Sequence, residues 1–571
     1  GLPTTAHPLL VHPLPRIDTE VCGISGVIGF PILEQESVAT SIQAISHRGP
    51  DDSGFVKGEN FHLGMCRLAI VDVKGGQQPV LSADKNIIAV FNGEIYNFQE
   101  IRSDLVSKGH RFFSNSDSEV IIPLYLEYGL DFPKKIQGMF AIAIYDKINQ
   151  TAILARDRLG KKPLWYTRKG KKLKFSSEIK GLLALDVERT PNLEVLSEYL
   201  QFGYVNAPRS AFKEIRQLVP GSILVYSKEG IDERRFWHIE NSEEISVPYQ
   251  EAKRKTHDLL IEAVSSRLLS ERPLGVFLSG GVDSSLVAAI MTRLIDKPIH
   301  SFSIGFQDPR FDESTFARNV AKHLGTIHHE EIVKPDPEFI VSTLGKVLDQ
   351  PFADSSIIPT YLLSQFARKD VVVALGGDGG DEVFGGYTRY RAALLLNRIN
   401  FLLAVNPTPS LVNLVNLNPR LEKLLRNSRM MALANRYQQF QTLIYKTELS
   451  SVLSKEIQLL NQSSFNFEEI WGKRDTDDEL RMMQECDLDS YLPGDLLVKA
   501  DMASMANSLE LRSPFLDFRV VEMGISLPQS YKIRRGITKY ILKDILSEYM
   551  SKDLFNRPKM GFAIPRAQWI R

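Results

Sequence analysis

Residues suited to chemistry fall into two groups in this 571-residue chain, and the first group starts at Cys22. Four polar segments follow it in order: 47–51 (HRGPD), 67–72 (RLAIVD), 92–97 (NGEIYN) and 116–119 (SDSE). Hydrolysis of an amide needs a nucleophile, a base and a pocket for the developing oxyanion. An isolated cysteine is more often a small buried hydrophobe, so the indication of a nucleophile comes from the ordered set.

The second group begins with a loop of small polar residues at 279–285 (SGGVDSS), between an apolar run and a predicted helix. Glycines let the backbone approach phosphate oxygens, and a helix N-terminus presents oriented N–H groups. The serine hydroxyls add donors, and Asp283 can bind Mg²⁺. A capped helix after a tight turn is the simpler alternative, but the loop holds more small polar residues than capping needs.

A glycine-rich segment with several acids, 376–387 (GGDGGDEVFGGY), follows the predicted buried strand 371–375. In an open α/β sheet, ligands bind beyond the carboxyl ends of the strands. The pattern therefore predicts that this segment and the 279–285 loop contribute to one site.

Two patterns of secondary structure must position these residues. In the first part, a helix near 36–46 and short strands at 87–92, 140–146 and 151–156 predict packed sheets with outer helices, a layout that fades near 220. The polar stretch 240–244 reads as a linker. Beyond it, helices at 249–269 and 284–294 alternate with strands at 274–278, 299–306 and 371–375, which predicts a parallel sheet followed by a mostly helical region at 391–549.

The first group resembles the glutaminase domain of class II glutamine amidotransferases, over most of residues 22–180. The resemblance implies that Cys22 is the nucleophile and that Asn92 and Gly93 form the oxyanion hole. The glutamine-binding residues it implies are Arg67, Ile70, Val71, Asn92, Gly93, Glu94 and Asp117. The simpler alternative makes Asn92-Gly93 only a hairpin turn.

In that family the cysteine is N-terminal and its own α-amine is the base, whereas Val21 precedes Cys22 in this sequence. We therefore expect residues 1–21, which contain four prolines, to be a disordered or non-native extension that is absent from the working enzyme.

The second group resembles the PP-loop of ATP pyrophosphatases and the synthetase signature of asparagine synthetases. The resemblance implies a nucleotide site of Phe277, Ser279, Gly280, Gly281, Asp283, Ser284, Ser285, Ile304, Gly376 and Gly377. Asp283 and Asp381 would hold Mg²⁺. Asp378, where that family usually has Glu, would lie near an acyl-adenylate, and Lys539 would stabilise the phosphoryl charge. Segment 509–517 (LELRSPFLD) matches a helix-to-loop segment of the family.

Together these features predict an α/β and α+β multidomain protein. Residues 22–240 would form an N-terminal nucleophile hydrolase, an α-β-β-α sandwich, and residues 241–571 a parallel-sheet synthetase domain of the adenine nucleotide α-hydrolase-like type.

Composition excludes several other classes. Lys+Arg and Asp+Glu both number 69, which gives no case for a nucleic-acid or membrane partner. Three cysteines without CxxC spacing argue against a disulfide framework and favour the cytoplasm. No apolar run is long enough to span a bilayer.

The two resemblances, joined on one chain, imply a glutamine-hydrolysing asparagine synthetase that uses glutamine, ATP and a carboxylate acceptor, with aspartate as the expected acceptor and a homodimer as an open possibility. Ammonia would pass from the Cys22 site to the acyl-adenylate. One alternative is the same chemistry on another carboxylate, such as a cell-wall or sugar-acid precursor or a natural-product intermediate. Another is a silent structural homologue, which we would expect to have lost Cys22, Asp283 or Asp381.

Overall fold

The computed structural model describes residues 22–30, 37–49, 51–68, 70–72, 75–239, 244–334, 337–403, 433–460, 467, 471, 478–557 and 564. The predicted extension at 1–21 and most of the predicted linker at 240–244 lie outside these residues.

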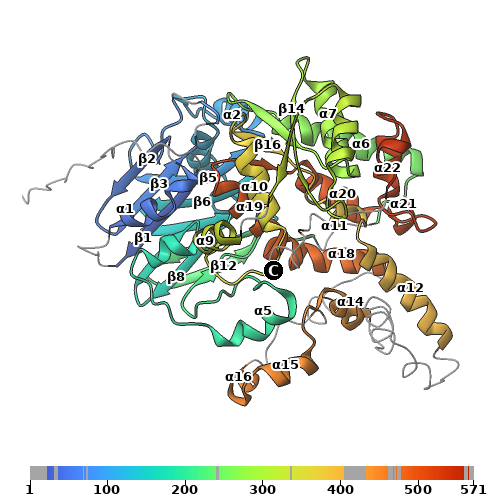
Figure 1. Cartoon of the computed structure of the whole chain (residues 1–571). Coiled ribbons are helices and arrows are strands. Elements are labelled where there is room, and N and C mark those ends of the chain that lie inside the picture. Colours follow the sequence, from blue (N-terminus) through green and yellow to red (C-terminus); the bar gives the residue numbers. More distant parts are fainter. Residues whose placement is uncertain are drawn as a thin grey trace, which may run out of the picture.

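The first part of the chain folds into two stacked six-stranded sheets (Figure 1). One sheet has the order β10-β8-β9-β1-β3-β2, with β1 (Gly23–Gly29), β2 (Asp52–Lys57), β3 (Phe61–Arg67), β8 (Trp165–Lys169), β9 (Lys172–Ser176) and β10 (Arg216–Gln217). The other has the order β12-β11-β7-β6-β5-β4, with β4 (Val80–Leu81), β5 (Ile87–Ile95), β6 (Gly138–Asp146), β7 (Thr151–Arg156), β11 (Ser222–Ser227) and β12 (Gly230–Arg235).

Alternating side chains of β5 explain the layers. Ile88 and Val90 pack into the core between the sheets, while Ile87, Ala89 and Phe91 pack against helices. Helices α2 (Phe98–Ser107) and α3 (Ile121–Tyr128) cover this outer face, and α1 (Val38–Ala44) and α4 (Ile179–Leu183) cover the other sheet. The result is the predicted α-β-β-α sandwich.

The second part contains the predicted parallel sheet, with the order β15-β14-β13-β16-β17. Its strands are β13 (Leu274–Phe277), β14 (His300–Phe306), β15 (Ile327–Val333), β16 (Val373–Leu375) and β17 (Glu510–Arg512). One face packs with α6 (Tyr249–Arg267), α7 (Val282–Leu294), α20 (Phe518–Ser526) and α22 (Tyr540–Leu546). The other face packs with α10 (Ile357–Ala367) and α19 (Leu497–Met505).

Two expectations from the sequence, and one alternative weighed beside them, are wrong. The layered pattern does not fade near residue 220, because β11 and β12 continue the second sheet to Arg235. Asn92-Gly93 is not a hairpin turn, since both residues pair with β6 inside the continuous strand β5. Segment 509–517 is not a helix-to-loop segment, because its residues 510–512 form β17, the edge strand beside β16.

Among the described residues, no helix combines the length and the apolar character needed to cross a bilayer.

Candidate active sites

Cys22 lies directly before β1 and its side chain faces the backbone of Leu68. The Sγ atom accepts a hydrogen bond from the Leu68 N–H at 3.0 Å and lies 3.5 Å from the Leu68 carbonyl oxygen. Burial raises the pKa of the Cys22 thiol to about 12, and the carboxylate of Glu510 adds to the increase. The thiol therefore needs a base, or a nearby positive charge, to become a nucleophile.

A cavity of about 350 Å³ opens at Cys22. It is lined by Cys22, Arg67, Leu68, Ile70, Val71, Gln78, Phe91, Gly93, Glu94, Ser116, Asp117 and Glu510. The fold thus brings together every residue of the predicted glutamine site except Asn92, whose side chain is buried beside the cavity.

Asn92 and Gly93 occupy the middle of β5, and their backbone explains why these residue types stand there. A side chain at Gly93 would meet the carbonyl oxygen of Met139 at 2.0 Å, and its φ of +148° disfavours other residues. The Asn92 Nδ2 lies 3.5 Å from the Ser177 hydroxyl, too far for a strong hydrogen bond. The amide therefore has no strong hydrogen bond to Ser177.

The cavity is lined by both a guanidinium and carboxyl groups. The guanidinium of Arg67 donates to the carbonyl oxygens of Val71 and Asp72 at 3.2 and 2.8 Å. In the same cavity, burial raises the pKa of Asp117 to about 6 and that of Glu94 well above its usual range. This arrangement suits a zwitterion whose carboxylate lies at Arg67 and whose ammonium lies at the acids.

The phosphate-type loop leads from β13 into the N-terminus of α7. The Ser279 Oγ accepts from the Gly281 N–H at 3.2 Å and lies 3.0 Å from the Ser284 Oγ. Gly280 has a φ of +74° that the turn requires. Backbone N–H groups of residues 282–285 begin a 13-residue helix, and its partial positive end favours an anion.

The second glycine-rich loop packs directly on the first. A side chain at Gly377 would meet the Asp283 Cβ and the Ser284 N at 2.9 Å, so only glycine allows this approach. The Gly376 N–H donates to the Arg512 carbonyl oxygen at 2.8 Å, which fixes the loop to β17. Of the other predicted nucleotide residues, Phe277 ends β13, and Ile304 is a buried residue of β14.

Lys539 is buried between the two predicted metal-binding carboxylates. Its Nζ contacts the Asp283 Oδ2 and lies 2.7 Å from the Asp381 Oδ1. Lys539 adopts a left-handed backbone with a φ of +51° before α22, a strained conformation often found at functional positions. The two carboxylates raise the pKa of Lys539 above its usual range despite burial, so the residue is a fixed cation.

The donor set at this point fits a nucleotide-bound Mg²⁺ ion. Mg²⁺ is usually held by one or two carboxylates together with substrate phosphates, and Asp283 and Asp381 supply two. A metal site made by protein side chains alone would need more ligands than these two carboxylates. In the part of the chain that the structure describes, no group of three or more His, Cys, Asp and Glu side chains could hold a metal ion.

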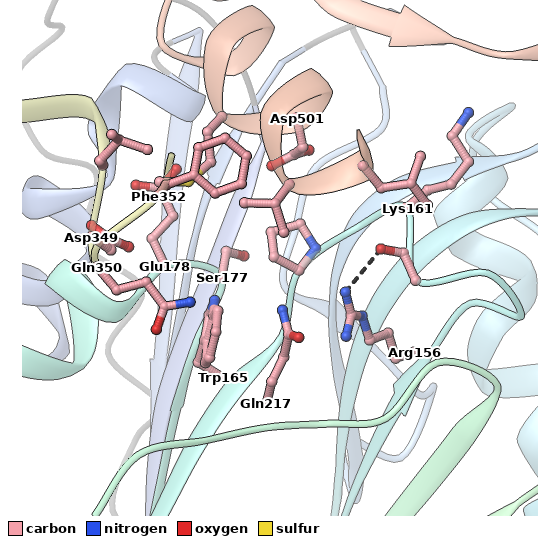
Figure 2. Close-up of a pocket in the computed structure, with 16 residues that line it drawn as sticks. Arg156, Lys161, Trp165, Ser177, Glu178, Gln217, Asp349, Gln350, Phe352 and Asp501 are labelled. Atoms are coloured by element: carbon pink, nitrogen blue, oxygen red, sulfur yellow. Dashed lines mark hydrogen bonds between the residues drawn. The ribbon is translucent and has the colours of Figure 1, made fainter. Parts of the chain in front are cut away.

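A second cavity, of about 500 Å³, lies between the two parts of the chain (Figure 2). Glu178 and Lys161 line it from the first part, and Asp349 and Asp501 from the second. Burial and the nearby cations Arg267 and Lys162 lower the pKa of Lys161 to about 7.

Three further residues contribute to the sites without a role predicted from the sequence, although Arg48 and Glu510 lie in the segments 47–51 and 509–517. Arg48 bonds to Glu178 at 2.8 Å, to Asp501 at 2.7 Å and to the Cys22 carbonyl oxygen at 3.2 Å, and so joins the two parts of the chain next to Cys22. Arg557 donates to the Ser279 carbonyl oxygen at 3.0 Å. Glu510 lines the Cys22 cavity from β17. All three act through contacts between residues distant in sequence.

A four-layered sandwich with a cysteine-centred pocket, joined to a parallel sheet with an SGGxDSS loop, defines the class of glutamine amidotransferases coupled to an ATP-dependent ligase. Comparison with known proteins agrees. A family model for asparagine synthase matches residues 255–571, and a model for a glutamine amidotransferase domain matches residues 21–237. The chain belongs to the glutamine-hydrolysing asparagine synthetase family.

Several relatives match the chain over almost its whole length. The chain is 31% identical to asparagine synthetase [glutamine-hydrolyzing] 1 of Bacillus subtilis, over 96% of this chain and 88% of that protein. It is also 31% identical to a putative asparagine synthetase [glutamine-hydrolyzing] of Mycobacterium tuberculosis, over 94% of this chain and 85% of that one. The amidase chyE of Penicillium rubens is 28% identical over 96% of this chain and 89% of its own length.

Proposed function

We propose that this protein is a glutamine-dependent asparagine synthetase. It hydrolyses glutamine to glutamate and ammonia, converts the aspartate side-chain carboxylate into an acyl-adenylate with release of pyrophosphate, and forms asparagine and AMP by attack of ammonia. The observation that carries the proposal is that Arg512 contacts both candidate sites. Its side chain holds Glu94 of the Cys22 cavity at 2.8 Å, and its carbonyl oxygen accepts from Gly376 of the nucleotide loop at 2.8 Å.

In the glutaminase half-reaction, the Cys22 Sγ attacks the amide carbon and the oxyanion is held by the Asn92 amide and the Gly93 N–H. Collapse of this intermediate expels ammonia and leaves a thioester, which water hydrolyses to glutamate. The base is the α-amine of Cys22, whose pKa near 8 suits proton transfer from the thiol, in a species without residues 1–21. Intact-mass measurement of the active protein tests this point. An active species that keeps all 21 residues would contradict it.

In the synthetase half-reaction, the backbone N–H groups at the start of α7 and the Lys539 ammonium hold the phosphates. A carboxylate oxygen of the acceptor attacks the α-phosphorus of ATP, and pyrophosphate leaves. Asp283 and Asp381 would hold Mg²⁺, which supplies charge neutralisation on the phosphate oxygens. Adenylation matters because AMP is a far better leaving group than the oxide of a free carboxylate.

Ammonia has a short internal route in this proposal. The cavity between the two parts of the chain shares Glu178 and Asp501 with the ion pairs of Arg48, and Arg48 also contacts the Cys22 carbonyl oxygen. Transfer through this region would keep ammonia from bulk water, where it would be protonated. If labelled free ammonia in the solvent entered the product as fast as glutamine nitrogen, this route would be refuted.

A different carboxylate acceptor is the second candidate function, and two observations favour considering it. Asp378 stands where the family usually has Glu, so the carboxylate is one methylene shorter beside the expected acyl-adenylate. A relative that is named an amidase matches 96% of the chain. The reaction would be the same, with amide formation on another carboxylic acid.

An acceptor screen distinguishes the two candidates. The protein is incubated with ATP, Mg²⁺ and glutamine and with one carboxylic acid at a time, and AMP and pyrophosphate are followed. AMP formation that depends on aspartate is expected, together with asparagine in the products. AMP formation only with another acid would move the assignment to that acid. Cys22→Ala should abolish the reaction with glutamine but leave the reaction with free ammonia.

A further inference from the structure

The wall of the Cys22 cavity is completed by a residue from the other half of the molecule. Glu510 belongs to β17, the edge strand of the parallel sheet, yet it lines the same cavity as Cys22, Arg67 and Asp117. It is only 4% exposed. A carboxylate this buried needs a compensating charge or hydrogen bonds.

Arg512 holds Glu510 in place, two residues along the same strand. The Arg512 Nε donates to the Glu510 Oε1 at 2.8 Å, and the Arg512 Nη2 donates to the Glu94 Oε2 at 2.8 Å. The Nη1 group donates to the carbonyl oxygens of Arg267 and Leu269 at 2.9 and 2.6 Å. One guanidinium therefore fixes two carboxylates that come from different halves of the chain.

The cavity brings three carboxyl groups close to the Arg512 guanidinium, which bonds to two of them. Three buried carboxylates, Glu94, Asp117 and Glu510, line the cavity, and the Glu94 Oε1 has no hydrogen-bond partner among the described residues. Glu510 contributes to the raised pKa values of both Glu94 and Asp117, as like charges do in a buried site. A bound cation with hydrogen-bond donors would stabilise this cluster.

We propose that Glu510 is a third carboxylate of the binding site for the α-ammonium group of glutamine, supplied to the glutaminase half by the synthetase half. This inference rests on the proposed function, because it takes glutamine as the ligand of the Cys22 cavity. Arg67 lines the same cavity and takes the α-carboxylate, and the α-ammonium on the same carbon is bound by Glu94, Asp117 and Glu510. The glutaminase pocket is then complete only when β17 is in place.

Direct binding to the full chain tests the role of Glu510. In a Cys22→Ala background, which prevents turnover, calorimetry compares L-glutamine with 4-carbamoylbutanoate, which is glutamine without its α-amino group. Glu510→Gln keeps an acceptor for Arg512 but removes the charge. We expect it to weaken glutamine binding by about tenfold or more, because a charge-assisted hydrogen bond is lost, and to leave binding of the desamino compound within about twofold.

Two further variants control the comparison. Glu262→Gln removes the same charge from an exposed ion pair with Arg519 in the same half of the chain, and it should leave glutamine affinity unchanged. Glu510→Asp keeps the charge, so it should retain more glutamine affinity than Glu510→Gln. This comparison remains informative if one variant folds poorly, which circular dichroism would reveal.

Each result decides a separate point. Equal losses for glutamine and the desamino compound would show that Glu510 only supports the structure, and unchanged glutamine affinity would overturn the inference directly. If the Cys22→Ala parent bound neither compound, the assignment of the cavity to glutamine would fail, and the inference with it.

Discussion

Replacement of Asn92 by alanine tests the oxyanion hole with little disturbance of the fold. The Asn92 side chain is fully buried, but its Nδ2 makes only a 3.5 Å contact with Ser177, and its Oδ1 has no hydrogen-bond partner among the described residues. A single weak hydrogen bond contributes about 0.5–1.5 kcal/mol, so the free energy of unfolding should change little. Loss of one oxyanion donor costs about 2.7–4 kcal/mol in the transition state, or about 10²–10³ in kcat.

The assay measures glutamate release and, in parallel, AMP formation with free ammonia. Asn92→Ala should lower kcat for glutamate release by about 10²–10³ and leave ammonia-dependent AMP formation within about twofold. Asn149→Ala, an exposed asparagine of the same half of the chain, is the matched control and should leave both rates unchanged. A decrease of less than about threefold in glutamate release, or an equal decrease in both rates, would refute the assigned role of Asn92.

Three further predictions concern charge. Lys539→Met should lower AMP formation by at least about 100-fold but spare glutamate release. Because Asp283 and Asp381 lose their buried cation in this variant, Mg²⁺ should raise its Tm more than that of the wild type. Equal Tm shifts would contradict this. Asp117 has a pKa raised to about 6, so it is ionised above pH 6 and protonated below. The KM for glutamine should therefore increase as the pH falls through about 6, and a flat KM between pH 5 and 8 would argue against Asp117 as an ammonium ligand. Arg48→Met removes the buried cation that Glu178 and Asp501 share and leaves them the weaker contacts with Lys180 and Lys162. It should cost about 3–5 kcal/mol, measured as a lower urea midpoint of the transition that separates the two halves. An unchanged midpoint would show that this ion-pair cluster adds no net stability.

The sequence by itself determined the order of the chemical groups and the class of fold. Short apolar runs between turn residues predicted β7 at residues 151–156 without error, and the predicted strands at 274–278, 299–306 and 371–375 differ from the observed strands by one or two residues at an end. These patterns succeed because they report whether a residue is buried within its own element. The SGGVDSS loop was equally visible, since glycine, serine and aspartate at a strand-to-helix turn are demanded by local backbone geometry.

Where the local sequence pattern and the pairing of strands indicated different secondary structures, the strand pairing determined the observed one. Asn92-Gly93 has the sequence of a hairpin turn, yet it lies inside β5 because nine residues of that strand pair with β6. Residues 510–512 are too few to show a period, and only the open edge of β16 makes them a strand. Lys539, which taken singly has the character of a solvated helix lysine, is buried because Asp283 and Asp381 converge on it.

Only the tertiary structure decided how the two halves share their sites. Arg48 meets Asp501, Glu94 meets Arg512, and Glu510 reaches the Cys22 cavity, across separations of more than 400 residues. Apolar periodicity identifies the buried face of an element but carries no information about which distant charged residues will oppose one another. The order of the candidate residues of each half can therefore be read from the chain, whereas the position of Glu510 in the wall of the Cys22 cavity follows from the packing of β17 against β16 and against the first half.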